Sequence, residues 1–213
     1  MASAQWTETG AWASASVFGK LTDVIDYSLS GAVRWENDVT RIGQSFLSAE
    51  LEYNLPGNFS VSADYRQGSS RRSDMTWRGL QRGSVDLKWK QKLTKKADVG
   101  MRLKAQSGYK GSLLDIAQTT FKTALRLRPT AYFDLPKGRR ISTSVEFFMR
   151  PYAASYYWTD TRYRVSFKDK VAKRKYLTIS YLFEKERGGP DPWAYHVISV
   201  DFSLKRKRKS VDK

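Results

Sequence analysis

Apolar and polar residues alternate with a period of two along most of the chain. Residues 25–36, IDYSLSGAVRWE, show the pattern most clearly. One parity is uncharged from Tyr27 to Trp35, whereas the three charges, Asp26, Arg34 and Glu36, all have the opposite parity. Successive side chains of a β-strand point to opposite faces of the sheet, so this segment predicts a strand with one apolar and one charged face.

The same alternation returns in nine further segments. In all ten together, the apolar parity contains no Asp, Glu, Lys or Arg, and every charge has the other parity. The further segments are residues 44–55, 59–66, 83–90, 98–105, 121–128, 141–150, 160–168, 177–184 and 196–204. No part of the chain shows the spacing of an amphipathic helix, so the sequence predicts an all-β protein.

An eleventh segment, residues 10–21, also resembles a strand, but its two faces are ambiguous. Trp12 and Phe18 share their parity with Ser14 and Ser16. Because bacterial single-chain barrels have even numbers of strands, we expect this segment either to join with a strand not recognised in the pattern, making twelve, or to lie outside a ten-stranded barrel.

The connections between the segments fall into two groups. Short or basic turns at 22–24, 56–58, 94–97, 136–140 and 171–175 alternate with longer connections that follow residues 36, 66, 106, 150 and 186. Outer-membrane barrels have short turns on one rim and longer loops on the other. The pattern therefore predicts a closed antiparallel transmembrane β-barrel of ten to twelve strands. Pro129, within a strand-like run, predicts a bulge or the end of regular pairing.

Alternation alone does not say which face points outward. A soluble barrel that carries an apolar ligand would bury the apolar face and give the same periodicity. Three features favour the membrane: the segments reach the roughly 9 to 11 residues of a spanning strand, no helix is available to cap a soluble barrel, and aromatic residues lie near the ends of the apolar runs. Those aromatic residues are Tyr27, Trp35, Tyr53, Tyr65 and Trp89.

In a membrane barrel, the charged face would line the lumen. Lumens of this size with many charges of both signs are expected to hold paired ionic networks, because unpaired buried charges are costly. We expect a structural or accessory membrane protein, or a narrow small-solute pore, with a lumen that is narrow or occluded. The predicted network consists of Asp26, Arg34, Glu50, Glu52, Asp64, Arg66, Asp86, Lys88, Arg102, Lys104, Arg126, Arg128, Glu146, Arg150, Arg162, Arg164, Glu184 and Asp201.

Composition limits the remaining possibilities. The 213 residues fit one domain over 1–213, with an N-terminal leader at 1–9 and a basic tail at 205–213. The first residues suggest a recombinant start from which a native signal peptide has been removed. There is no cysteine, so disulfides and thiolate metal sites are excluded.

The formal net charge of +17 normally suggests nucleic acid as a partner. The basic residues are spread over strands, turns and tail, so we expect anionic headgroups of membrane lipids or lipopolysaccharide instead, with other outer-membrane proteins as possible partners and no nucleic acid.

Several stretches also resemble a family of Bacteroidota outer-membrane proteins whose domain has no known function. The likeness covers nearly the whole chain and is carried by four segments: ELEYNLPGNFSVSADYRQ, ALRLRPTAYFDLPKGRRISTSVEFF, TDTRYRVSF and AYHVISVDFSL. The resemblance implies a location in the bacterial outer membrane. It implies no activity, substrate or catalytic residue.

A catalytic function has little support in the sequence. His196 is the only histidine and has the apolar parity, whereas Ser199 points to the other face. A lipid-modifying enzyme with His196 on the lipid face remains an alternative. Glu50 and Glu52 could in principle act as acid and base. No phosphate-binding loop or metal-ligand cluster is present, so we expect no catalytic residue, cofactor or metal.

Overall fold

The computed structural model describes residues 6–71, 74–112, 115–152, 155–187 and 193–207. Apart from one 3-10 turn at Pro136–Gly138, the regular elements in these ranges are strands. The strands are β1 (Trp6–Lys20), β2 (Ile25–Glu36), β3 (Arg41–Asn54), β4 (Phe59–Arg71), β5 (Trp77–Lys92), β6 (Ala97–Ser112), β7 (Asp115–Leu135), β8 (Arg139–Tyr152), β9 (Ser155–Ala172), β10 (Lys175–Glu186) and β11 (Trp193–Lys205).

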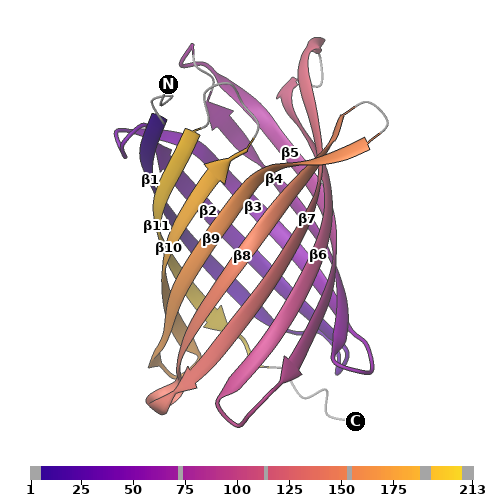
Figure 1. The fold of residues 1–213 in the computed structure, drawn as a ribbon, viewed down its shortest axis with the longest axis vertical. Helices are drawn as coiled ribbons and strands as arrows, with labels where there is room; N and C mark the ends of the chain where they lie inside the picture. The colour runs from indigo at the N-terminus through magenta and orange to yellow at the C-terminus, as the bar shows by residue number, and fades with distance from the viewer. Residues whose placement is uncertain (1–5, 72–73, 113–114, 153–154, 188–192, 208–213) are drawn as a thin grey trace.

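The strands form one closed barrel in which each strand pairs with its neighbours in the sequence (Figure 1). The prediction of a closed barrel of ten to twelve strands is confirmed. All ten clean segments are strands in the expected order, and adjacent strands along the chain are antiparallel.

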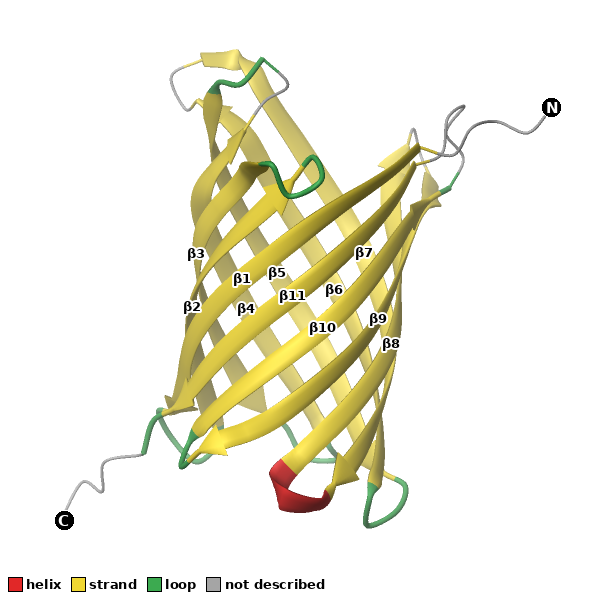
Figure 2. Cartoon of the chain, turned by 90° about the vertical axis from the view of Figure 1, so that its left-hand side faces the viewer, coloured by secondary structure: helices red, strands yellow, loops and turns green. Residues whose placement is uncertain are grey.

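The barrel closes differently from the prediction, which was an even number of strands that are all antiparallel. β1 lies between β2 and β11 and pairs with β11 in parallel, from Trp6 opposite Trp193 to Phe18 opposite Lys205 (Figure 2). The parallel pair is a consequence of the odd number of strands. When eleven strands alternate in direction, the first and the last run the same way, so closing the barrel between them requires one parallel ladder.

The N-terminal segment therefore neither joins with an unrecognised strand nor lies outside the barrel. It is β1, and it begins at Trp6, so residues 6–9 belong to the barrel rather than to a leader. Residues 1–5 of the expected leader and 208–213 of the expected tail lie outside the described residues.

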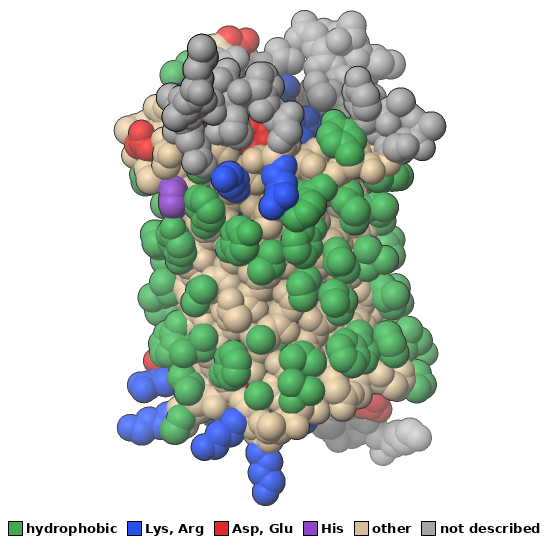
Figure 3. Space-filling view, viewed as in Figure 1, with side chains coloured by type: hydrophobic (Ala, Val, Ile, Leu, Met, Phe, Trp, Pro, Cys, Tyr) green, Lys and Arg blue, Asp and Glu red, His purple; other side chains and the backbone are tan. Residues whose placement is uncertain are grey.

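The apolar parity faces outward. Leu47, Leu29 and Val85 are 71%, 56% and 54% exposed, whereas Asp86 and Glu146, on the charged parity, are 3% exposed. Figure 3 shows the outcome as a broad hydrophobic band across the face of the barrel that it draws. The alternative of a carrier with the apolar face inside required the reverse arrangement and is wrong.

Aromatic side chains lie towards both rims of this band. Near the short turns, Phe59 pairs with Trp89, and Phe133 and Phe167 both pair with Ile141. Trp77, Tyr156 and Trp158 lie at the other rim and are exposed. Of the predicted girdle residues, Tyr27, Trp35, Tyr53 and Trp89 lie near strand ends, whereas Tyr65 lies near the middle of β4.

The connections at the long-loop rim are shorter than the sequence suggested. β3 begins five residues after β2 ends, and β7 and β9 begin three residues after β6 and β8 end, because these strands extend into residues that the alternation left irregular. β7 also runs through Pro129. Its pairing with β8 is recorded at Leu127 and again at Thr130 in the same register, so the proline interrupts the ladder without ending the strand.

The described residues contain no helix that is long and apolar enough to cross a membrane.

Candidate functional site in the barrel lumen

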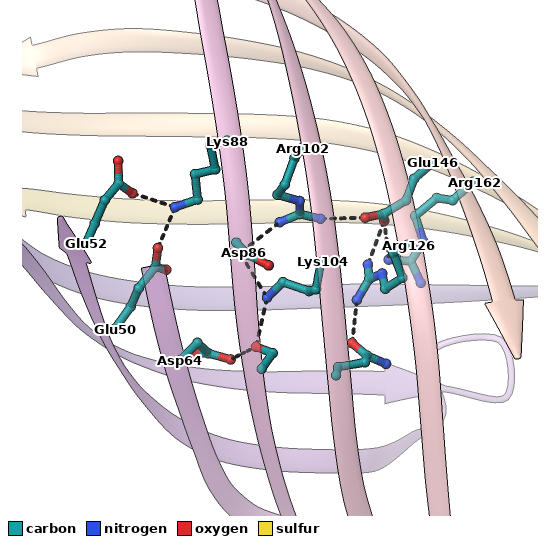
Figure 4. A network of polar contacts seen from close by, with 12 residues as sticks. Glu50, Glu52, Asp64, Asp86, Lys88, Arg102, Lys104, Arg126, Glu146 and Arg162 are labelled. Carbon is teal, nitrogen blue, oxygen red and sulfur yellow. Dashed lines mark hydrogen bonds and ion pairs between the residues drawn. The ribbon is translucent and has the colours of Figure 1, made fainter. Parts of the chain in front are cut away.

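A network of charged side chains crosses the interior of the barrel (Figure 4). Its members come from the inward parity of β3, β4, β5, β6, β7, β8 and β9, which is why residues far apart in sequence meet. The network has three parts, which are centred on Lys88, Asp86 and Glu146.

Lys88 is the centre of the part of the network that lies nearest the short-turn rim. Its Nζ atom donates hydrogen bonds to Glu50, at 2.6 Å, and to Glu52. One ammonium group therefore compensates two carboxylates on β3.

Asp86 forms the middle part. Its carboxylate lies 3.3 Å from Lys104 Nζ and 4.0 Å from Arg102. Lys104 also donates a hydrogen bond to Ser84 Oγ at 3.1 Å, and Ser84 donates to Asp64 Oδ1 at the same distance. Both Asp86 and Lys104 are buried, so this pair is held by charge and hydrogen bonding together.

Glu146 is the most heavily shared carboxylate. It pairs with Arg102, with Arg126 at 2.6 Å and with Arg162 at 3.7 Å. Arg162 also pairs with Glu184, which extends the network to β10. Three guanidinium groups therefore converge on one buried carboxylate near the middle of β8.

Three other predicted residues make local contacts instead of joining this network. Asp26 pairs with Lys20 at 3.3 Å. Arg150 pairs with buried Asp160 at 3.0 Å. Asp201 accepts hydrogen bonds from Ser14 and from Ser199, the latter at 3.0 Å.

Four predicted lumen arginines form no ion pair with a carboxylate in the part of the chain that the structure describes: Arg34, Arg66, Arg128 and Arg164. Arg34 lies over the rings of Trp12 and Phe46, 4.0 and 5.0 Å from their centroids.

 Arg66 lies 3.8 Å from the centroid of Phe46 and donates a hydrogen bond to Ser48 Oγ at 3.1 Å.

Two further arginines with the inward parity of β5, Arg78 and Arg82, also form no ion pair with a carboxylate among the described residues. Arg82 was not among the predicted residues, because it precedes the segment of clean alternation at 83–90. The Nε atoms of Arg82 and Arg128 are buried and make no hydrogen bond within the described ranges. The lumen therefore combines a paired network with a set of guanidinium groups that retain free donors.

Sequence reasoning also missed the aromatic residues inside the barrel. Phe46 and Phe148 are each 7% exposed, and Arg126 and Arg162 lie over the ring of Phe148 at 4.4 and 5.0 Å. Their parity, shared with the neighbouring charged residues, would have placed both rings in the lumen. Trp12 could not be placed, because residues 9–19 of its strand contain no charge that would define the inside.

The lone histidine lies on the outer face. Tyr181 Oη and His196 Nδ1 are 2.6 Å apart, and Phe183 packs against the His196 ring. Thr9 is opposite His196 on β1, but its hydroxyl donates to Asp38 at 2.7 Å. No group of three or more potential metal ligands occurs among the residues described.

A cavity of about 440 Å³ lies inside the barrel near the short-turn rim. Asp26, Glu50 and Glu52 contribute carboxylates to its lining, and Lys20 and Lys205 contribute ammonium groups. Lys88 holds Glu50 and Glu52 at its inner end.

These features define a closed β-barrel with an apolar outer surface and an ion-paired interior. The chain belongs to the family described as "Protein of unknown function (DUF2490)", whose model matches residues 9–193. The predicted family resemblance is confirmed to that extent, and its attribution to Bacteroidota stays a prediction. A search of curated proteins found no match.

Proposed function

We propose that this protein spans the bacterial outer membrane and acts there as a structural or accessory component with an occluded lumen. The observation that carries the proposal is the segregation of the two faces. The outward parity exposes large apolar side chains on every side of the barrel, and hydrocarbon is the environment that stabilises such a surface. The strands are 12 to 21 residues long, which exceeds the roughly 9 to 11 needed to span.

The charges at the rim support the same orientation. Lys and Arg side chains gather at the short-turn end below the hydrophobic band in Figure 3. Lys95, Lys96, Lys137, Lys173 and Arg174 belong to the turns at this rim. Each such residue near an anionic surface contributes on the order of 1 kcal/mol. Membrane lipids or lipopolysaccharide are therefore the partners that we propose, and other outer-membrane proteins are a further possibility.

The ion pairs support an occluded lumen rather than a wide pore. Arg102 bridges Asp86 on β5 to Glu146 on β8, and Arg162 on β9 extends over the ring of Trp12 on β1, so charged side chains fill the interior from several strands. A small-solute pore is the second candidate. The cavity of about 440 Å³ at the short-turn rim favours it, because it brings solvent part of the way into the barrel.

Vesicle insertion tests the membrane role. The refolded protein should insert into phospholipid vesicles, remain with them in alkaline carbonate, and migrate in SDS without boiling as a compact species. Failure to insert, with a monodisperse protein in buffer that lacks detergent, would contradict the proposal.

Planar-bilayer recording then separates the two candidates. Silence after insertion supports the structural role, and steady unitary currents support the pore. The lipid-modifying alternative predicts turnover of phospholipid or lipid A that His196→Ala abolishes, and absence of turnover by the intact protein removes that alternative.

A further inference from the structure

Three of the unpaired arginines lie on one wall of the lumen, which is formed by β2 to β5. Arg66 on β4 and Arg82 on β5 are direct cross-strand partners, and both have the inward parity. Arg34 lies on β2, two residues before that strand ends. All three residues are in the half of their strands nearer the long-loop rim.

Their neighbours along the ladder supply no carboxylate. Ser48 lies beside Arg66 on β3, and Gly108 lies beside Arg82 on β6. A Cβ atom at Gly108 would lie 3.0 Å from Cα and Cβ of Arg82. β6 therefore leaves the flank of Arg82 without a side chain.

The carboxylates in this part of the lumen either bind other residues or lie too far from the three arginines to form an ion pair. Asp64 attracts both Arg66 and Arg82, but it accepts a hydrogen bond from Ser84 and forms no ion pair within the described chain. Glu50 is bound by Lys88, and Glu146 is shared by three other arginines.

Aromatic rings hold the like charges together. Arg34 and Arg66 both lie over the ring of Phe46, and Arg34 also lies over the ring of Trp12. Stacking uses the faces of the guanidinium groups and leaves the N–H groups at their edges available. Arg34 is buried among guanidinium groups of the same charge, of which Arg66 and Arg162 act on it most, so a bound anion would offset both its burial and their repulsion.

We propose that Arg34, Arg66 and Arg82 form a binding site in the lumen for an oxyanion of the phosphate class. Forked guanidinium donors match the oxygen geometry of phosphate, and several of them together favour a dianion over chloride. The inference deepens the proposed function by assigning a ligand class to the same lumen. It does not require a bilayer, because the site is formed within one folded barrel.

Calorimetric titration of inorganic phosphate into the protein in nonionic detergent at low salt tests the site. The intact protein should bind phosphate saturably, with about one ion per barrel, and chloride at the same concentration as phosphate should not compete. Arg34→Met and Arg82→Met should each weaken binding about tenfold or more, the loss typical of a charge-assisted contact. A sugar phosphate distinguishes sources: if it also binds, the site accepts organic phosphates, and if it does not, the ligand is inorganic phosphate.

Arg139→Met is the matched control, because it removes the same charge from the exposed pair with Asp169 at the other rim. It should leave phosphate affinity unchanged. If Arg82→Met does not fold, Arg66→Lys supplies the test, because it keeps the charge, loses the fork and should still weaken binding. Absence of saturable binding to the intact protein, or equal loss in Arg139→Met, would overturn the site.

Vesicle insertion is measured separately, so that the oxyanion site and the membrane role can be tested independently. A protein that inserts but binds no phosphate overturns the oxyanion site alone, and one that binds phosphate but does not insert overturns only the membrane role.

Discussion

Replacing Glu146 with alanine should strongly destabilise the barrel. Glu146 is 3% exposed and is the carboxylate shared by Arg102, Arg126 and Arg162. The substitution leaves all three guanidinium groups in place. Arg162 retains Glu184 and Arg102 retains Asp86 at 4.0 Å, whereas Arg126 loses its only ion pair among the described residues.

The expected loss follows from the electrostatics of a buried site. At an effective dielectric constant of about 20, opposite charges 4 Å apart attract by about 4 kcal/mol. Much of this attraction offsets the cost of desolvating Glu146 itself, which the substitution removes. Breaking a buried pair by deleting one partner typically costs about 3 to 5 kcal/mol, and we expect a loss in that range for Glu146→Ala.

Equilibrium unfolding by urea in lipid vesicles or micelles measures the difference. Asp169→Ala is the control, because Asp169 pairs with Arg139 at 3.3 Å where both side chains are partly exposed. Its loss should be about 0 to 1 kcal/mol. A loss below about 1 kcal/mol for Glu146→Ala would refute the view that this carboxylate holds the lumen network together.

Three further substitutions or conditions test other parts of the structure. Gly68→Ala should cost about 1 to 3 kcal/mol in the same unfolding assay, because its Cβ would lie 2.5 Å from Cβ of Phe46. Val165→Arg should cost about 2 to 4 kcal/mol in vesicles if this outward residue meets hydrocarbon. Hydrogen bonds from Thr9 hold the pKa of the Asp38 carboxyl below its usual range. Their stabilisation should therefore be complete above the pKa of an unfolded aspartate and lost as pH falls through the lower folded value, which hydrogen exchange at the Thr9 amide would detect.

Each of these expectations has a contrary result. A neutral Gly68→Ala would show that β3 and β4 can separate at no cost. A neutral Val165→Arg would show that the side chain lies in water. An acid-independent exchange rate at Thr9 would show that the Asp38 carboxylate does not hold β1 to the loop at 37–40.

Alternation was sufficient to predict the ten later strands and the two faces of each, whereas the outward direction of the apolar face also needed the strand lengths and the positions of the aromatic residues. It worked because neighbouring residues have opposite environments: Asp86, for example, faces the charged lumen, whereas Val85 faces the apolar outer surface. β1 lacked that contrast. Trp12 and Ser14 face inward while Ala11 and Ala13 face outward, and the only charges of the strand, Glu8 and Lys20, lie near its two ends, so the stretch between them has no charged face.

Pairing partners within the lumen could not be predicted from parity. Strand tilt and register decide that Glu146 meets Arg102 and Arg126, and that Arg66 meets Arg82 without a carboxylate between them. The parallel β1–β11 ladder was missed for a related reason. The expectation of an even number of strands came from other bacterial barrels, whereas the strand count here requires one parallel pair.

The orientation of the barrel in a bilayer is the central claim, and spin labelling tests it most directly. The chain has no cysteine, so Leu47→Cys and Ser62→Cys each provide one labelling site, the first 71% exposed on the outer face and the second 2% exposed on the inner face. In vesicles, power saturation should show the label at Leu47 to be accessible to oxygen and protected from a water-soluble nickel complex, whereas the label at Ser62 should lack that oxygen access. A label at Leu47 that is freely accessible to the nickel complex in the presence of vesicles would contradict the account.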